Sequence, residues 1–150
     1  MTLVRKMWAI GFVAVVAACI TAGPALAQPA TWDQAKVTAL AKDLAAAGNA
    51  WWQALQDQPG GATVGSGDSQ AFDQMTRESH LIQEQSAGLA GSLAGGKGRA
   101  ETLDMYKSLK EMADDMKVDE QRTSLEAPAL AAWAKFAGVM KQLAPYYSAK

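Results

Sequence analysis

Cysteine and histidine are almost absent from this sequence, which has one of each in 150 residues, Cys19 and His80. Cys19 lies in an N-terminal segment that we expect to be removed, so the mature chain would contain no cysteine. Such a chain has no disulfide, no thiolate zinc site and no cysteine nucleophile. It also cannot attach haem through a Cys-x-x-Cys-His motif, and it has to be stabilised by packing alone.

An excess of basic side chains is also missing. The sequence has 14 lysines and arginines against 15 aspartates and glutamates. Loss of Arg5 and Lys6 with the N-terminal segment would leave 12 basic side chains and a formal charge of −3. Nucleic-acid binding depends on basic patches that neutralise phosphates, so this balance argues against a nucleic acid as partner.

The N-terminus has the three parts of a secretory signal. Arg5 and Lys6 supply positive charge, residues 7–20 form an apolar run, and residues 25–27 (Ala-Leu-Ala) form a small-x-small cleavage site. The apolar run is shorter than the about 20 residues that a membrane-spanning helix needs, and no later stretch reaches that length. We therefore expect a periplasmic or secreted protein with no transmembrane span after signal removal.

These features divide the chain into a signal peptide, residues 1–27, and a single mature domain, residues 28–150. One alternative is an uncleaved N-terminal anchor. Another is a lipid-anchored form, because residues 16–19 (Val-Ala-Ala-Cys) are similar to a bacterial lipobox in which Cys19 would be acylated. The cleavage site downstream of Cys19 favours release.

Four segments of the mature domain have the composition and spacing of amphipathic helices, and none alternates like a strand. We expect helices over residues 31–56, 69–94, 100–117 and from 128 to 145, the first capped by Thr31 with Gln34 reaching back. Gly-rich residues 57–69 form a flexible connector, and residues 95–98 (Gly-Gly-Lys-Gly) form a tight helix hairpin. This pattern predicts an all-α, up-and-down bundle of about four helices.

Each segment has an apolar stripe at steps of three and four residues, which places the stripe on one helix face. Gly88 and Gly91 interrupt the second segment and would let another helix approach closely. Pro145 ends or kinks the fourth segment. The stripes, in chain order, are Val37, Leu40, Leu44, Ala47, Trp51 and Leu55; Phe72, Met75, Ile82, Leu89 and Leu93; Met105, Leu109, Met112 and Met116; and Leu130, Trp133, Ala137, Met140 and Ala144.

Few residues are candidates for metal binding. His80 is a candidate ligand or general base, although it falls away from the apolar stripe of its helix. Met112 and Met116 lie one helical turn apart and could bind Cu(I) through their thioethers, or serve as adaptable core residues. The acidic residues from Glu111 to Glu120 lack the spacing of an EF-hand and favour a solvated surface.

Aromatic residues supply the candidates for a ligand or interface site. Trp52 follows Trp51 and cannot share its direction, because successive helical residues are about 100° apart. Trp52 is therefore expected at a boundary, where it would line a pocket or interface. Trp133, Tyr146 and Tyr147 are candidate companions, and ordinary packing near the bundle end is the alternative for all four.

Catalytic motifs are missing. The run from Gly91 to Gly98 is superficially similar to a phosphate-binding loop, but Gly98 follows the lysine where Ser or Thr is required, and a helix precedes it instead of a strand. The sequence has no Gly-x-Ser-x-Gly and no Ser-x-x-Lys motif. We therefore expect a non-catalytic protein without a cofactor.

The overall plan is similar to the exported four-helix cytochromes of the c′ and b562 type, with a signal, four helices and a Gly-Lys hairpin between the second and third. Haem in the b562 type is held by a methionine of the first helix and a histidine of the last. Residues 31–56 contain no methionine and the last segment contains no histidine. The resemblance thus implies an architecture and no ligand residues.

The sequence favours an exported helical bundle that acts by binding a protein partner or a small apolar ligand. The alternative is a carrier of metal or non-covalent haem, with His80, Met112 and Met116 as ligands. Purification of the protein with bound copper or haem would favour that alternative.

We expect the exported protein to begin at Gln28, because a signal peptidase would cut after residues 25–27. Intact-mass spectrometry of protein from the extracytoplasmic fraction measures this directly, and Cys19→Ser should give the same mass. A mass that includes acylated Cys19, or all of residues 1–27, would contradict cleavage at Ala27.

Overall fold

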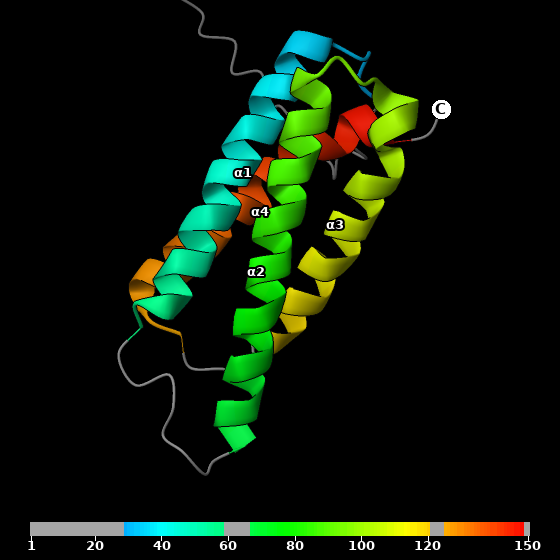
Figure 1. Ribbon diagram of the computed structural model, residues 1–150. Coiled ribbons are helices and arrows are strands. Elements are labelled where there is room, and N and C mark those ends of the chain that lie inside the picture. Colours follow the sequence, from blue (N-terminus) through cyan, green and yellow to red (C-terminus); the bar gives the residue numbers. More distant parts are fainter. Residues whose placement is uncertain (1–28, 59–66, 121–124, 149–150) are drawn as a thin grey trace, which may run out of the picture.

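The computed structural model describes residues 29–58, 67–120 and 125–148, and it shows no strand among them. They form α1 (Gln34–Gln56), α2 (Gly67–Ala94), α3 (Arg99–Glu120) and α4 (Ala127–Tyr147). The predicted all-α bundle is confirmed (Figure 1). The expected signal peptide with Cys19, and most of the expected connector, lie outside the described residues.

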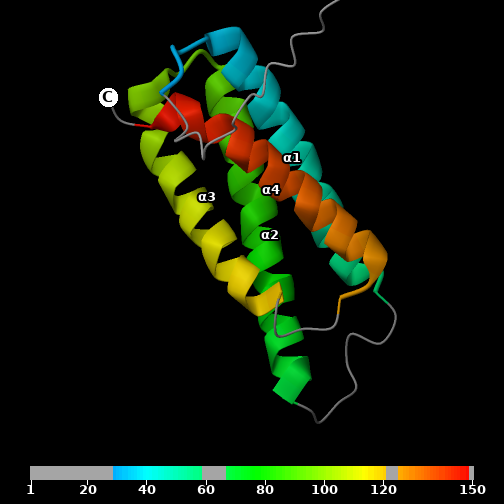
Figure 2. The same cartoon turned by 180° about the vertical axis from the view of Figure 1, so that it is seen from behind.

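Successive helices run in opposite directions, as an up-and-down bundle requires (Figures 1 and 2). α1 packs most extensively, against α2 on one side and α4 on the other, and α3 packs against α2. The contact between α3 and α4 is the smallest of the four neighbouring pairs. Figure 2 shows α3 and α4 close together where α4 ends and farther apart towards the start of α4.

α1 begins three residues later than the sequence suggests. Asp33, not Thr31, is the N-cap, and its side chain accepts a hydrogen bond from the Lys36 amide. The Gln34 side chain does not reach back to the cap. It accepts from the Trp32 indole and donates to the Leu93 carbonyl, so it joins α1 to the end of α2.

Gly48 sets the distance between α1 and α2. A Cβ atom at this position would lie 2.8 Å from Ser86 Oγ and 3.6 Å from Gln83 Cα. Ser86 is fully buried, and its hydroxyl donates to the Gln83 carbonyl. The expected close approach at Gly88 and Gly91 is wrong, because a Cβ atom at Gly88 would make an ordinary contact with Met105 and one at Gly91 would meet nothing within 4 Å.

Residues 95–98 form the expected helix hairpin. Gly96 adopts a φ of 88°, a left-handed conformation that favours glycine. The Gly95 amide donates to Gly91 O, and the Gly98 amide donates to the Glu101 carboxylate at the start of α3. These bonds use backbone groups that a phosphate-binding loop would turn towards its ligand.

α4 buries most of the broad apolar face that its spacing suggests, including Trp133 and Met140, but not all of it. Leu130 is 41 % exposed and Ala137 is also exposed, whereas Phe136 and Leu143 are fully buried. The helix also continues through Pro145 to Tyr147. The Pro145 carbonyl, left free at the helix end, accepts a hydrogen bond from the Ala30 amide at 2.9 Å.

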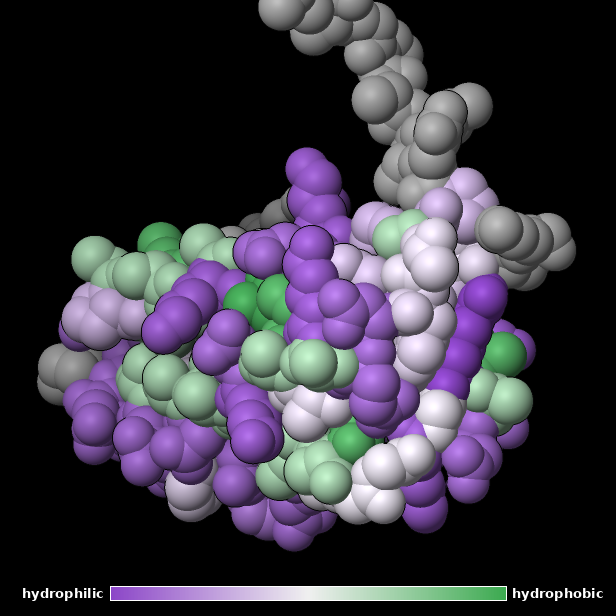
Figure 3. Space-filling view, turned by 90° about the horizontal axis from the view of Figure 1, so that it is seen from above, coloured by the Kyte–Doolittle hydropathy of each residue, from purple (hydrophilic) through white to green (hydrophobic). Residues whose placement is uncertain are grey.

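The core lies between α1, α2 and α4, with α3 covering it from the side of α2. Its largest fully buried side chains are Trp51, Phe136, Leu44, Leu55, Met75, Ile82, Leu89, Leu93, Leu109, Met116, Leu143 and Val37. Seen from above, the surface is mostly hydrophilic, with hydrophobic residues in scattered patches (Figure 3). Within the described residues, every helix is too short or too polar to cross a membrane.

Substitution of Gly48 should show how tightly α1 and α2 are packed. Gly48→Val would force its methyl groups against Ser86 and the α2 backbone, and we expect a loss of about 1–3 kcal/mol in the free energy of unfolding. Gly91→Ala, in the same bundle but with open space around it, should stabilise by up to about 1 kcal/mol. Urea unfolding followed by circular dichroism measures both, and equal effects would contradict a close contact at Gly48.

Candidate functional site

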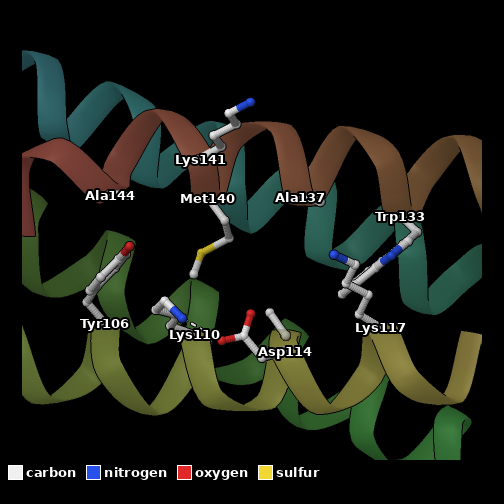
Figure 4. Close-up of a pocket in the computed structure, with 10 residues that line it drawn as sticks. Tyr106, Lys110, Asp114, Lys117, Trp133, Ala137, Met140, Lys141 and Ala144 are labelled. Atoms are coloured by element: carbon white, nitrogen blue, oxygen red, sulfur yellow. Dashed lines mark hydrogen bonds and ion pairs between the residues drawn. The ribbon is translucent and has the colours of Figure 1, made fainter. Parts of the chain in front are cut away.

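A groove of about 300 Å³ lies between α3 and α4, where the bundle packs least closely. α3 and α4 form its two walls, with Tyr106 near one end and Trp133 near the other (Figure 4). The residues that line it are Tyr106, Lys110, Ala113, Asp114, Lys117, Trp133, Ala137, Met140, Lys141 and Ala144.

The groove exists because small residues occupy positions that larger ones would fill. Ala137 and Ala144 come from α4 and Ala113 comes from α3. The sequence assigned Trp133, Ala137, Met140 and Ala144 to a core stripe, and the structure places this stripe along the groove. An apolar face that was expected to be covered by a neighbouring helix is therefore partly open.

Trp133 forms an apolar wall of the groove. Its side chain is only 6 % exposed, and its ring lies 5.4 Å from the Trp51 ring and 5.6 Å from the Phe136 ring. Aromatic contacts at such distances are favourable beyond the area they bury. A ligand in the groove would thus meet a surface that is already ordered.

Charged side chains border the groove. Lys110 and Asp114 form an ion pair one turn apart on α3, and both side chains are more than half exposed. Exposed pairs of this kind contribute little stability. Lys117 forms no ion pair with another described residue, and its ammonium group points towards α4, whereas that of Lys141 points away from α3 (Figure 4). Three lysines and one aspartate make the groove border positive.

Tyr106 closes one end of the groove. Its ring stacks on Tyr147 with centroids 4.1 Å apart and planes 6° apart. Tyr106 is 6 % exposed, and its hydroxyl points towards α4 without a hydrogen-bond partner among the described residues (Figure 4). Burial raises the pKa of Tyr106, and electrostatic interactions with Tyr147 and Asp114 raise it further. The phenol is therefore neutral at physiological pH and can donate a hydrogen bond.

Tyr146 and Tyr147, two of the sequence-derived ligand or interface candidates, lie buried at the end of α4. The Tyr147 hydroxyl is 2.9 Å from Thr102 Oγ1, and its ring also meets Trp32 edge-on at 5.4 Å. Burial raises the pKa of Tyr147. Tyr146 packs beneath Lys36, whose ammonium lies 5.9 Å from the ring centroid. Both tyrosines thus tie the end of α4 to other helices.

Trp52 lies at a boundary, on the outer side of α1 and α2. It is half-buried, and its ring lies 5.3 Å from the His80 ring. His80 Nε2 is 3.9 Å from a Glu84 carboxylate oxygen. A shallow open pocket surrounds them, lined by Trp52, Gln56, Thr76, Arg77, His80 and Leu81.

The structure does not bring the metal-ligand candidates together at this pocket. Neither Met112 nor Met116 lines it, and Met116 is fully buried on α3. Among the described residues, no three His, Cys, Asp or Glu side chains form a group that could hold a metal ion. The side chains of Asp119 and Glu120 lie outside the described set.

Sequence reasoning did not single out Tyr106, Lys110 or Lys141 as site residues. Tyr106 flanks the apolar stripe of α3 and has the spacing of a core residue. The signal that could have identified the site is the alternation of alanines with Trp133 and Met140 along α4. Small side chains on one helix face leave space between that helix and its neighbour.

Comparisons with known proteins add no family to these observations. No protein-family model matches the chain, and neither the curated proteins nor the solved structures contain a significant match. The resemblance to four-helix cytochromes is thus one of helix order, and α1 contains no methionine and α4 no histidine.

Alkaline pH should destabilise the folded protein through its two stacked tyrosines. Their pKa values lie above the ordinary value of about 10 in the folded state, so the unfolded chain releases these protons first. Stability is fully present below about pH 10 and is lost as the pH rises through the folded values. Urea unfolding at pH 8 and pH 11 should show a smaller alkaline loss in Tyr106→Phe than in the wild type, and equal losses would contradict this account.

Proposed function

We propose that this protein is an exported, non-catalytic helical bundle that binds a small apolar ligand in the groove between α3 and α4. The observation that carries this proposal is the groove along α4 from Trp133 to Ala144, opposite Ala113 and Tyr106 on α3, in which Ala137 is exposed. A helix face of this kind is ordinarily covered in a bundle core.

The dimensions of the groove support a small molecule as the occupant. Its volume of about 300 Å³ lies at the lower end of the range for ligand sites, about 300–1,000 Å³. Apolar walls with a few polar groups at the border are also typical of such sites. A ligand that covered exposed Ala137 and the partly exposed Ala113 and Ala144 would remove apolar surface from water, which is favourable.

The polar groups at the groove support binding in preference to catalysis. They are three lysines, one aspartate and one tyrosine, and Lys110 is already paired with Asp114. The histidine of the sequence, the residue best suited to proton transfer at neutral pH, lies on α2 beside Trp52 instead. No side chain at the groove is therefore paired with a base that would activate it as a nucleophile.

Export forms the second half of the proposal and depends on the sequence of residues 1–27. The charged start, apolar run and small-residue site support release into the periplasm or beyond. Acylation of Cys19 would give the same bundle a membrane tether. In either form the groove would meet ligands outside the cytoplasm.

A protein partner is the second candidate, and the surface around Trp52 favours it. Leu81 is 47 % exposed next to half-buried Trp52 on the neighbouring helix. Exposed apolar side chains beside an aromatic ring are common at interfaces. The open shape of this pocket suits a flat contact better than a small ligand.

Filling the groove should weaken ligand binding. Ala137→Trp places a large ring where Ala137 lines the groove, and we expect it to weaken binding of the fluorescent apolar probe 1-N-phenylnaphthylamine at least about tenfold, as loss of a buried apolar contact area implies. Ala131→Trp is the matched control, because Ala131 is exposed on the same helix and does not line the groove.

Probe fluorescence titrations measure both variants, and circular dichroism checks that each remains helical. A wild-type protein that does not bind the probe would overturn the proposed site. Equal loss in Ala131→Trp and Ala137→Trp would do the same.

A further inference from the structure

α2 is the longest helix of the described chain, and one face along its length is uncovered. α1 and α3 pack against its other faces, and its start extends beyond both neighbours (Figure 1). The residues of the uncovered face recur at steps of three and four, so they lie on one side of the helix. This outer face of α2 includes Asp73, Arg77, His80, Leu81, Glu84 and Gly88, all of which are exposed.

The centre of the outer face is apolar and hollowed. Leu81 is 47 % exposed, and among the described residues only one other large apolar side chain, Leu130 on α4, is exposed. The shallow pocket beside Leu81 is walled by Trp52, whose ring lies 5.3 Å from that of His80. A leucine that protrudes next to a hollow can fit a second copy of the same surface, because a two-fold axis brings each leucine to the hollow of the other copy.

Two opposite charges lie at equal distances on either side of this centre. The midpoint of the 28-residue helix falls between His80 and Leu81. Arg77 lies three residues before His80, and Glu84 lies three residues after Leu81. Arg77 forms no ion pair or hydrogen bond with another described residue, and the Glu84 carboxylate lies 3.9 Å from His80 Nε2. Both charges are therefore available to a partner.

This symmetry favours a second copy of the chain with its α2 antiparallel. In a two-fold contact, a residue that meets a second residue of the partner is met in turn by the same pair reversed. With the axis between residues 80 and 81, Arg77 of each copy faces Glu84 of the partner subunit, so two ion pairs form. A parallel contact would place like charges opposite each other, which is unfavourable.

The two ends of α2 suit the same arrangement. Asp73 near the start of the helix would lie opposite Gly88 of the partner subunit, and Gln74 would lie opposite Ala87 of the partner subunit. Larger side chains at one end thus meet small ones at the other, and helices approach more closely where the contacting side chains are small. Because the axis falls at the midpoint of the helix, the two copies overlap along its whole length.

We propose that this protein forms an antiparallel homodimer through the outer face of α2. Leu81 packs against His80 and Trp52 of the partner subunit, and the two Arg77–Glu84 pairs flank this apolar centre. The proposal goes beyond ligand binding, because none of these residues lines the groove between α3 and α4.

Sedimentation equilibrium of the protein purified from the extracytoplasmic fraction tests the dimer. One helix face is a small interface, so we expect a dissociation constant on the order of 10 µM. Arg77→Glu and Glu84→Arg should each weaken the dimer at least about tenfold, because each places like charges opposite each other twice.

An equimolar mixture of these two variants should dimerise again. The copy with two acidic side chains then faces the copy with two basic ones, so both ion pairs form with favourable sign. Positions 77 and 84 are about 10 Å apart along the axis of one helix. Recovery in the mixture therefore comes from contact between copies.

Leu81→Ala and Leu130→Ala form a matched pair, because the two leucines have similar exposure and lie on different helices. Leu81→Ala should weaken the dimer at least about fivefold through lost apolar contact, and Leu130→Ala should stay within about twofold of the wild type. Lys107→Glu, on the exposed side of α3, is the control for a reversed charge and should also leave the dimer unchanged. Circular dichroism establishes that each variant is folded.

A wild type that stays monomeric up to about 1 mM would overturn the proposal and leave the outer face of α2 to a different protein. A mixture no more dimeric than its two components would overturn the antiparallel register, and equal effects of Leu81→Ala and Leu130→Ala would show that another face is used. Ligand binding in the groove is tested separately by Ala137→Trp, so it can stand when the dimer fails.

Discussion

The stack of Tyr106 on Tyr147 is the contact on which the groove depends. α3 and α4 share the smallest interface of the bundle, and this pair of rings, with the Thr102–Tyr147 hydrogen bond, joins them at one end. Beyond it the helices diverge, and Ala137 and Ala144 are too small to close the space. The contact that stabilises the end of α4 thus also holds a phenol at one end of the groove.

The other half of the bundle is packed differently. Gly48 and Ser86 bring α1 and α2 into close contact, and the fully buried Trp51 fills the core next to Trp133. This rigid half supports the wall of the groove, whereas α3 is attached mainly through α2. A bundle with one tight and one loose helix pair combines a closely packed core with an open groove, without a disulfide in the described residues.

Helix periodicity predicts the number, type and order of the elements, because each segment carries a stripe that only a helix would align. It predicts less well which part of a stripe is covered. Leu130 fits the α4 pattern yet is exposed, and Ala137 fits it yet lines the groove. The spacing of apolar residues identifies the apolar face of one helix. Which part of that face is buried depends on the angle at which a second helix crosses it. Tyr106 was missed for the same reason. Its spacing along α3 is that of a core residue, and a tyrosine that lines a groove can have the same spacing.

The hydrogen bond from the Ala30 amide to the Pro145 carbonyl joins the first described turn of the chain to its last helix. Together with the edge-on contact of Trp32 and Tyr147, it joins the start of the described chain to its last helix. These contacts cannot form before α4 has formed. The same holds for part of the packing of α1, because α1 packs against α4 as well as against α2. A chain that lacked α4 would therefore leave one side of α1 uncovered.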